Sequence, residues 1–478
     1  MNLINKAPQF VLETLSKLET AGFEAYIVGG CVRDLLMERT PKDWDITTNA
    51  RPEQVLQVFP EAKYQNDFGT VLLPLHDDDN NVLEITTYRS EFGYSDRRHP
   101  DEINFEDNIE EDLKRRDFTI NAMAINKSDE LVDLFGGIKD LRLKIIRAVG
   151  EPVERFKEDS LRMMRALRFS CQLGFAIEPK TERGIMKMAG SIKFVSKERI
   201  HDELIKIISS PRPAGGIMDL HHSKLLQYII PELEDGVNVK QFHHHVYPVF
   251  EHNVLSLKHC PSASYQVRLA ALLHDIGKPR VFKLVNGQGT FYNHEYVGAK
   301  MTDKILRRLK FSNEDIDRIV NLVRNHMFYY NVGEVTATSV RRLIIKTGRE
   351  NLKDLIDLRI ADRLGSGDLK PKPYKLRHLE YMLEKVQHDP ISVKMLKIDG
   401  SDLMTLLKIE PSPKIGAILD VLLSEVIENP DLNVKEYLAD RSLELNKLDL
   451  QQLRDQAKEK IEEQRHIDDQ LLKKDFHV

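Results

Sequence analysis

Hydrophobic and polar residues switch between helical and strand spacing over the first part of the chain. Apolar side chains recur at helical intervals from residue 8 to 21, and Gly22 precedes the apolar run from Ala25 to Val28. This pattern predicts a helix, a turn and a strand. Further β-rich runs lie at residues 44–48, 71–75, 82–88 and 122–125. The first 150 residues are therefore predicted to form a small α/β domain.

The rest of the chain is predicted to be mostly helical. From Val153 onward apolar residues recur at helical intervals, and strand signals nearly vanish. Proline and glycine interrupt this pattern at residues 211–213, 231, 261 and 365–373. Helices are expected to end there, and 478 residues exceed what one core fills. We predict four domains, at residues 1–150, 151–235, 236–370 and 371–478.

Composition narrows the setting and the kind of partner. Lys and Arg total 70 against 75 Asp and Glu, a formal net charge of −5, so any RNA-binding surface must be local. Cys31, Cys171 and Cys260 lie far apart and form no Cys-x-x-Cys pair, which favours a reducing compartment. The N-terminus lacks signal-peptide features, and no apolar run reaches membrane-spanning length. We expect a soluble cytoplasmic protein whose charged residues 451–478 form a solvated helix.

A glycine pair and an acidic pair form the first candidate site. Gly29 and Gly30 follow a strand and precede a short helix, where missing side chains let backbone N–H groups approach a phosphate. Asp43 and Asp45 lie two residues apart on a predicted strand, which directs both carboxylates to one face. Such a pair can hold Mg²⁺, which stabilises the leaving pyrophosphate in phosphoryl transfer. A lone Asp-x-Asp also occurs on ordinary solvent-facing strands.

The residues around these pairs make the pattern specific. Gly-Gly-x-Val-Arg-Asp followed by Asp-x-Asp-x-x-Thr resembles the head motif of class II, bacterial-type CCA-adding tRNA nucleotidyltransferases and their poly(A) polymerase relatives. The resemblance implies an α/β nucleotidyltransferase head with a DNA polymerase β-like palm, an all-α neck and body, and a helical C-terminal tail. It also implies that Asp43 and Asp45 are catalytic Mg²⁺ ligands. Glu84, on a neighbouring predicted strand, is a candidate third carboxylate.

A second motif, Arg-Arg-Asp-Phe-Thr-Ile-Asn from Arg115, resembles the family segment that contacts the sugar and phosphates of the incoming nucleotide. Together the two motifs imply nucleotide binding by Gly30, Arg33, Arg116, Asp117 and Asn121. A guanidinium can grip phosphate oxygens with two parallel hydrogen bonds, so Arg33 and Arg116 suit a triphosphate. Salt bridges on a helix are the alternative reading of the same arginines.

Two shorter segments extend the resemblance. Asp133 and Gly136–Gly137 are similar to the connecting motif between head and neck, and a simple turn explains them equally well. Arg89, Arg97 and Arg98 lie in a Tyr- and Gly-containing segment that resembles the flexible loop assisting terminal A addition. The presence of this segment argues against an enzyme that adds only CC.

The segment Glu-Asp-Ser-Leu-Arg-Met-Met-Arg-Ala-Leu-Arg, from Glu158, is the most informative for specificity. Its three-residue steps are predicted to bring Asp159, Arg162 and Arg165 within reach of one helical stripe. A carboxylate accepts and a guanidinium donates hydrogen bonds, so together they can imitate the Watson–Crick edge of a base. In the family such residues select CTP and ATP, and Arg168 belongs to the same expected nucleotide-binding set. A plain helix ion pair is the alternative.

A second constellation of histidine and aspartate follows on successive predicted helices. The adjacent His274 and Asp275 lie in an apolar helix, where a buried carboxylate is costly unless a partner or metal compensates it. The pattern resembles an α-helical HD phosphohydrolase domain. That resemblance implies metal ligation by His252, His274, Asp275 and Asp362, with His294 and His326 at additional positions found in some members.

Imidazole and carboxylate ligands suit Mn, Fe, Ni, Co or Zn, and such a metal can activate water to attack a phosphoester. The sequence does not choose among these metals. An HD fold retained as a spacer or dimer surface is the alternative. The adjacent His243, His244 and His245 cannot share one helical face, so we expect them to be surface or RNA-facing residues.

The resemblance implies template-independent addition of CCA to tRNA, with CTP and ATP as substrates and a phosphodiesterase or phosphatase activity in the HD domain. An A-adding enzyme or a poly(A) polymerase uses the same head. The sequence has no strongly basic tail that would follow a long RNA tract, which weakens the poly(A) polymerase alternative. An RNA-binding phosphohydrolase with an inactive head, or a non-enzymatic scaffold, is the alternative from another class. The sequence leaves open whether the protein is a monomer or a homodimer.

Overall fold

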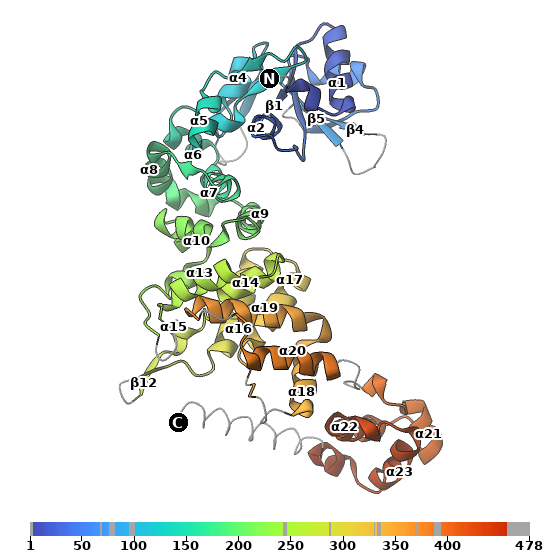
Figure 1. The fold of residues 1–478 in the computed structure, drawn as a ribbon. Helices are drawn as coiled ribbons and strands as arrows, with labels where there is room; N and C mark the ends of the chain where they lie inside the picture. The colour runs from blue at the N-terminus through green and yellow to red at the C-terminus, as the bar shows by residue number, and fades with distance from the viewer. Residues whose placement is uncertain are drawn as a thin grey trace. The chain divides into compact units, whose positions relative to one another are not determined.

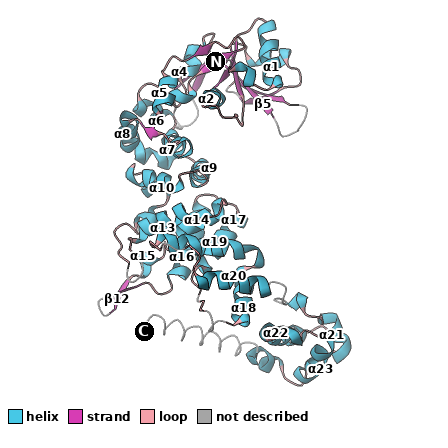
Figure 2. Ribbon diagram, in the orientation of Figure 1, coloured by secondary structure: helices cyan, strands magenta, loops and turns pink. Residues whose placement is uncertain are grey.

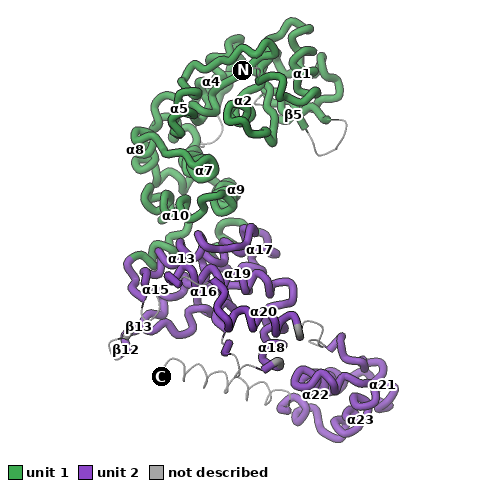
Figure 3. The backbone as a smooth tube through the Cα atoms, in the orientation of Figure 1, with its two compact units in different colours: residues 1–237, 305–311 green, residues 238–304, 312–478 purple. Residues whose placement is uncertain are grey.

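The computed structural model describes most of the chain, namely residues 3–66, 69–75, 82–94, 101–241, 246–285, 288–328, 330–331, 336–368, 371–386 and 393–456. The chain forms two compact units (Figure 3). The first contains residues 1–237 and 305–311, and the second contains residues 238–304 and 312–478. Helix α16 (His294–Arg308) therefore begins in the second unit and ends in the first.

A seven-stranded mixed sheet organises the N-terminal part of the first unit, in the order β3-β4-β5-β2-β1-β8-β9. Figure 2 draws strands in magenta. Its strands are β1 (Ala25–Val28), β2 (Asp45–Thr48), β3 (Lys63–Asn66), β4 (Thr70–Pro74), β5 (Val82–Thr87), β8 (Ala124–Asn126) and β9 (Leu131–Val132). Strand β2 pairs parallel with β5 and antiparallel with β1. The four strands predicted after residue 28 each match one of these strands to within two residues at each end.

Helices cover the sheet and close its core. They are α1 (Gln9–Thr20), α2 (Gly30–Leu36), α3 (Pro52–Val58), α4 (Ile109–Lys114) and α5 (Gly137–Leu143), with the short η1 (Ile4–Lys6) and η2 (Thr119–Asn121). Leu15 and Leu18 of α1 pack with Ile27, Ile46 and Ile85 of three central strands. The hairpin β6 (Arg89–Phe92) and β7 (Glu102–Phe105) forms a separate two-stranded sheet. This α/β head confirms the predicted class of the N-terminal domain.

The remainder of the first unit is helical (Figure 1). It contains α6 (Pro152–Glu158), α7 (Arg162–Leu173), α8 (Pro179–Met188), η3 (Ala189–Phe194), α9 (Lys197–Ile208), α10 (Pro213–His222), α11 (Leu226–Ile229) and α12 (Pro231–Glu234). Two-residue strands β10 (Ile145–Ile146) and β11 (Ala176–Ile177) pair in parallel. Helix α7 ends at Gly174, whose φ of 75° provides the left-handed backbone that commonly ends helices.

The second unit is also predominantly helical. Its first part comprises α13 (Val249–His259), α14 (Tyr265–Leu273), α15 (Lys278–Val281), α16, α17 (Asn313–Asn325), α18 (Ala337–Thr347), η4 (Arg349–Asn351), α19 (Leu352–Gly365) and α20 (Tyr374–Val386), with the hairpin β12 (Lys283–Val285) and β13 (Gln288–Thr290). Gly365 allows α13 and α19 to pack closely, because a Cβ there would lie 2.8 Å from the backbone nitrogen of Ser256.

The C-terminal helices have a core of their own. They are η5 (Val393–Met395), α21 (Gly400–Leu407), α22 (Pro413–Glu428), η6 (Pro430–Leu432) and α23 (Lys435–Leu445). Leu403, Ile418, Leu422 and Leu438 are fully buried in this core. Of the expected solvated helix, residues 457–478 lie outside the described residues. No helix in the described ranges is long and apolar enough to cross a membrane.

Candidate functional site

Three acidic residues meet at the edge where β2 begins. Asp45 is the first residue of β2 and is paired in register with Glu84 of β5. Burial, opposed by the Arg116 charge and reinforced by the Asp43 charge, raises the pKa of Asp45. Partial burial and the charges of Asp45 and Asp43 raise the pKa of Glu84. These carboxylates disfavour each other's charge, so a bound cation would relieve the repulsion.

The structure corrects one detail of the acidic pair. Asp43 lies in a bend before β2, whereas Asp45 lies within the strand. The alternation rule that was expected to place both carboxylates on one face therefore does not apply to Asp43. The negative charge of Asp43 nevertheless raises the pKa values of Asp45 and Glu84. Asp43 therefore belongs to the same acidic group, although it lies in the bend and not in the strand.

Gly29 brings the backbone close to this acidic group. It precedes α2 with φ 87° and ψ −130°, a backbone conformation available essentially to glycine alone. A Cβ at this position would lie 2.9 Å from Nη1 of Arg116 and 3.8 Å from Oδ2 of Asp45. Gly30 follows as the first residue of α2. The turn therefore brings the backbone at the start of α2 close to one carboxylate and one guanidinium, a combination that suits a nucleotide triphosphate.

The expected nucleotide-binding residues form a chain of hydrogen bonds. Arg33 donates from Nη1 to Oδ1 of Asn121 at 2.8 Å, and Asn121 donates to Oδ1 of Asp117 at 3.2 Å. Arg165 of α7 donates twice to Oδ2 of Asp117, from Nε at 2.8 Å and Nη2 at 2.5 Å. Burial raises the pKa of Asp117, but Arg165 outweighs it and holds the pKa at about 2. This series of hydrogen bonds connects α2 of the head to helix α7.

Asp159 and Arg162 do not share a helix, which corrects the predicted stripe. Helix α6 ends at Glu158, Asp159 is extended with φ −138° and ψ 105°, and α7 begins at Arg162. The three-residue step places side chains on one face only within a continuous helix. Arg162 instead donates from Nη1 to Oε2 of Glu158 at 2.5 Å and from Nη2 to the carbonyl oxygen of Arg115 at 3.0 Å.

Two residues of α9 complete this region and were missed from the sequence. Arg199 donates to both carboxylate oxygens of Asp159, at 3.2 and 2.7 Å. Glu203, one turn later on α9, accepts from Nε of Arg168 at 2.6 Å. Helix α9 thus supplies an opposite charge to each of two residues expected to bind nucleotide. The partners are 40 and 35 residues apart in sequence, so helical spacing gave no signal for either pair.

A buried charge network supports the base of the β6–β7 hairpin. Glu91 accepts hydrogen bonds from Nε of Arg89 at 2.8 Å, the Tyr94 hydroxyl at 2.5 Å and Nη1 of Arg115 at 3.2 Å. Arg115 also donates to the fully buried Asp112, from Nη2 at 2.6 Å. The hairpin stem is thereby tied to the segment that carries Arg116. Arg97 and Arg98 of the expected flexible loop lie outside the described residues.

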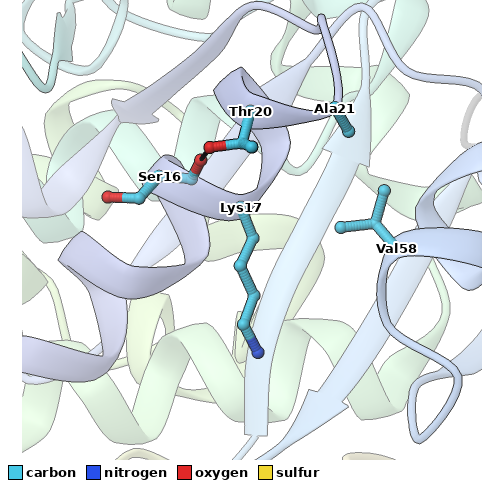
Figure 4. A pocket seen from close by; sticks show the side chains of 5 residues that line it. All are labelled: Ser16, Lys17, Thr20, Ala21 and Val58. Carbon is cyan, nitrogen blue, oxygen red and sulfur yellow. Dashed lines mark hydrogen bonds between the residues drawn. The ribbon is translucent and has the colours of Figure 1, made fainter.

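Two further features of the head lie apart from these groups. Asp133 accepts from the backbone nitrogens of Gly137 and Ile138, at 2.7 and 3.0 Å, and so anchors the start of α5. Figure 4 shows a shallow hollow lined by residues of α1 and by Val58 of α3, where Thr20 bonds the Ser16 carbonyl oxygen. None of the residues expected to bind nucleotide or metal lines this hollow.

The second constellation is assembled from five helices of the second unit. His252 lies in α13, His294 begins α16, His326 follows α17, and Asp362 lies in α19. His274 and Asp275 were expected inside a helix, but they follow directly after α14, which ends at Leu273. The candidate ligand atoms form two sets, and within each set all atoms lie within 4.8 Å of one another. One set is His252, His274 and Asp362, and the other is His274, Asp275 and His326. All six residues are buried.

Asp275 lies between the two histidine sets and uses a different oxygen for each. Its Oδ2 is 3.2 Å from Nε2 of His252 and 3.4 Å from Nε2 of His274. Its Oδ1 is 3.2 Å from Nε2 of His294 and 3.6 Å from Nε2 of His326. Asp275 could therefore contribute a carboxylate oxygen to a metal held by either histidine set.

Hydrogen bonds to the backbone orient the imidazole rings of this cluster. Nδ1 of His274, His294 and His326 lies 2.9, 2.9 and 2.7 Å from the carbonyl oxygens of Ala271, Phe291 and Val323. A donating Nδ1–H leaves Nε2 of each ring free for a metal. The convergence of four Nε2 atoms and two carboxylates fits a divalent transition metal.

Electrostatics in the cluster differ from those in the head. Burial would raise the pKa of Asp275, but His274 and Lys278 outweigh it and hold the pKa well below its usual range. Burial lowers the pKa of His326 to about 4. The Lys278 ammonium lies 2.5 Å from Oδ2 of Asp275 and 2.6 Å from Oε1 of Gln241. His243, His244 and His245 lie outside the described residues.

Comparisons with known proteins agree along the chain. Three family models match: Poly A polymerase head domain over residues 25–147, Probable RNA and SrmB-binding site of polymerase A over 174–236, and HD domain over 222–366. The chain is 34% identical to the A-adding tRNA nucleotidyltransferase of Deinococcus radiodurans, covering 83% of this chain and 90% of that protein. It is 32% identical to the CCA-adding enzyme of Lactiplantibacillus plantarum, covering 91% and 95%.

A solved structure extends this agreement to three dimensions. The chain resembles the Bacillus stearothermophilus CCA-adding enzyme, which was solved in complex with CTP, with a TM-score of 0.70 and 27% sequence identity. The match covers 92% of this chain and 97% of that chain. The predicted fold class, an α/β head followed by helical segments with an HD domain and a helical C-terminal region, is thus confirmed.

Proposed function

The chain belongs to the CCA-adding tRNA nucleotidyltransferase family, and from this premise we propose that it adds CTP, CTP and then ATP to the 3′ end of tRNA. The reaction needs no nucleic-acid template and releases pyrophosphate. One observation carries the proposal: the charge of Asp43 raises the pKa values of Asp45 and Glu84, and the Gly29 turn and Arg116 lie beside Asp45. The partners are tRNA, CTP and ATP, and the compartment is the cytoplasm.

The head residues divide the work of phosphoryl transfer. Mg²⁺, when bound by Asp43 and Asp45, would stabilise charge on the triphosphate and activate the attacking 3′-hydroxyl. Glu84 lies in register beside Asp45 and would orient or share that ion. Gly30, Arg33 and Arg116 receive the triphosphate, because the first exposes the N-terminus of α2 and the others carry guanidinium forks.

Protein side chains would read the base in place of a template. We assign Asp159 and Arg162 to the Watson–Crick edge of the incoming base, since one accepts and the other donates hydrogen bonds. Arg199 holds both oxygens of Asp159, and Glu158 holds Arg162, so each reading group is fixed by a partner of opposite charge. The sugar of the nucleotide and helix α7, which begins at Arg162, are supported by Asp117, Asn121, Arg165 and Arg168.

A separate phosphohydrolase activity is proposed for the HD domain. Its ligands are His252, His274, Asp275 and Asp362, with His294 and His326 forming a second position that shares Asp275. A divalent transition metal such as Mn, Ni, Co, Fe or Zn would activate water for attack on a phosphoester. The chain's own contribution is a buried set of candidate ligands, oriented imidazoles and the nearby positive charge of Lys278.

An A-adding enzyme is the second candidate, because one relative that covers most of the chain carries that name. The described stem of the β6–β7 hairpin belongs to the segment that resembles the loop for A addition, so both readings require it. An experiment must therefore distinguish a CCA-adding from an A-adding enzyme by whether the two C residues are added. A poly(A) polymerase would continue past a single A.

Purified protein and Mg²⁺ should be incubated with tRNAs that end before CCA, after the first C and after CC. Labelled CTP, ATP or both are supplied, and Asp43→Ala is the control. CTP incorporation into the first two substrates, followed by one A, is the expected result. Addition of A only to the CC end would identify an A-adding enzyme, and long A tracts a poly(A) polymerase. No incorporation on any substrate would contradict the proposal.

A further inference from the structure

Helix α20 has an outward face that is unusual for an amphipathic helix. Its inward face, Leu376, Leu379, Leu383 and Val386, packs in a core with residues of α18 and α19. At 3.6 residues per turn, the opposite face is formed by Tyr374, His378 and Tyr381. Charged residues normally occupy such a face, but here three ring-bearing residues follow one another. We call these three residues the aromatic face.

The rings of the aromatic face neighbour one another, and the outer two are exposed. Neighbouring centroids are 6.0 Å apart, from Tyr374 to His378 and from His378 to Tyr381. Tyr374 is 61% exposed and Tyr381 is 57% exposed. The Tyr330 hydroxyl lies 2.5 Å from Nδ1 of His378 and fixes the middle ring. The aromatic face is thus anchored at its middle ring and exposed at its outer two rings.

The charges beside the aromatic face favour an anionic partner. Residues 371–386 contain four Lys and Arg against two Glu, whereas the whole chain has a net charge of −5. Lys372 is paired with Glu380. Among the residues that the structure describes, Lys375 and Arg377 form no ion pair, and both are exposed. Two available cations therefore flank the open rings.

We propose that the aromatic face binds unpaired bases of RNA by stacking, while Lys375 and Arg377 contact the phosphates. Every base has a π-face, so rings on a basic surface bind single-stranded segments with little sequence preference. A protein partner is less consistent with this surface, since the tyrosines are flanked by cations and the face holds no aliphatic residue. The identity of the RNA as tRNA rests on the proposed function, but the stacking chemistry does not.

The test uses the full-length protein with two probes, a labelled oligoadenylate and tRNA lacking its CCA end. Tyr374→Leu combined with Tyr381→Leu keeps apolar area but removes the rings, and Tyr374→Phe combined with Tyr381→Phe keeps the rings. Tyr292→Leu is the matched control, because Tyr292 is 54% exposed and lies outside the face. Fluorescence anisotropy gives Kd, and CTP incorporation is measured in parallel.

The Leu pair should weaken oligoadenylate binding about tenfold or more, while the Phe pair and Tyr292→Leu stay within about twofold of wild type. Equal binding by the Leu pair would overturn the inference and leave the face to a protein partner. Equal losses in the Leu and Phe pairs would also overturn it, since hydroxyl groups would then carry the contact. If wild type binds through the rings but incorporates no CTP, the proposed function fails while this inference stands.

Discussion

The head and the HD domain present two opposite ways to prepare a metal site. In the head, Asp45 and Glu84 have raised pKa values, because partial burial and neighbouring acids disfavour their charges. In the HD domain, Asp275 and Asp362 are held well below the usual range by histidine and cationic neighbours. The head ligands are oxygens alone, whereas the HD cluster adds four imidazoles.

The difference indicates when each metal arrives. A few carboxylates at a sheet edge hold Mg²⁺ weakly, so nucleotide phosphates are needed to complete its coordination. Six buried candidate ligands from five helices already lie together without a substrate, so we expect this cluster to hold its metal on its own. We therefore expect the substrate to complete the metal site of the head, and the fold alone to form that of the HD domain.

Metal retention should separate the two sites most strongly. Protein purified and desalted without added metal should keep a transition metal in the HD cluster but no Mg²⁺ in the head, as measured by elemental mass spectrometry. Asp275→Asn should lose the retained metal, since Asp275 contributes to both histidine sets. Asp45→Asn is the control and should retain it. Full retention by Asp275→Asn would contradict the assignment of Asp275 as a metal ligand.

Gly29→Ala should disable the head alone. Its Cβ would lie 2.9 Å from Nη1 of Arg116, and its φ of 87° disfavours any side chain. We expect kcat/KM for nucleotide addition to fall about a hundredfold, since misplacement by about 1 Å costs that much, while HD phosphohydrolysis is unchanged. Gly22→Ala is a matched control, because Gly22 has φ 88° but nothing within 4 Å. Similar losses in both variants would show that strain, not the Arg116 contact, matters.

Arg199→Lys should affect base choice more than chemistry. Lysine keeps the charge but loses the two-pronged grip on Asp159. We expect discrimination between the correct and incorrect nucleotide to fall about tenfold, measured as a ratio of kcat/KM for CTP and ATP on each tRNA end. Arg183→Lys, at an exposed position of α8, is the control. An unchanged ratio would mean that Asp159 needs no such support.

Asp45→Asn should slightly stabilise the metal-free protein at neutral pH. The folded-state pKa of Asp45 is raised, so its ionisation destabilises the fold as pH rises through that pKa. Removing the charge should slightly raise the temperature of the thermal transition in which the head unfolds. Below the unfolded-state pKa the wild type should show no such deficit. A variant less stable than wild type at pH 7 would contradict the assigned direction of the shift.

The sequence predicted the elements and the residue types better than their local geometry. Strands β1 and β2 were identified within one residue, because short apolar runs between turn residues determine them. The placements of Asp43 and Asp159 failed for a common reason. Spacing rules of two or three residues assume a continuous strand or helix, and both residues lie just outside one.

Contacts between segments far apart in the sequence also limited what could be predicted from it. His274 and Asp275 stood out because charge is rare in an apolar segment, and the resemblance supplied the other candidate HD ligands. The helix expected to contain both residues ends at Leu273, and the ligand set stays a prediction. The grip of Arg199 on Asp159 joins residues 40 positions apart and follows from how α7 and α9 pack. No periodicity within either helix encodes that pairing.

The most direct test of two separate metal chemistries assays both activities on the same preparations. Wild type, Asp45→Asn and Asp362→Asn would each be tested for CTP and ATP addition to tRNA with Mg²⁺. Each would also be tested for hydrolysis of bis(p-nitrophenyl) phosphate with Mn²⁺ or Ni²⁺. The account predicts that Asp45→Asn loses addition and keeps hydrolysis, and that Asp362→Asn does the reverse. Loss of both activities in either folded variant, or loss of addition in Asp362→Asn, would contradict it.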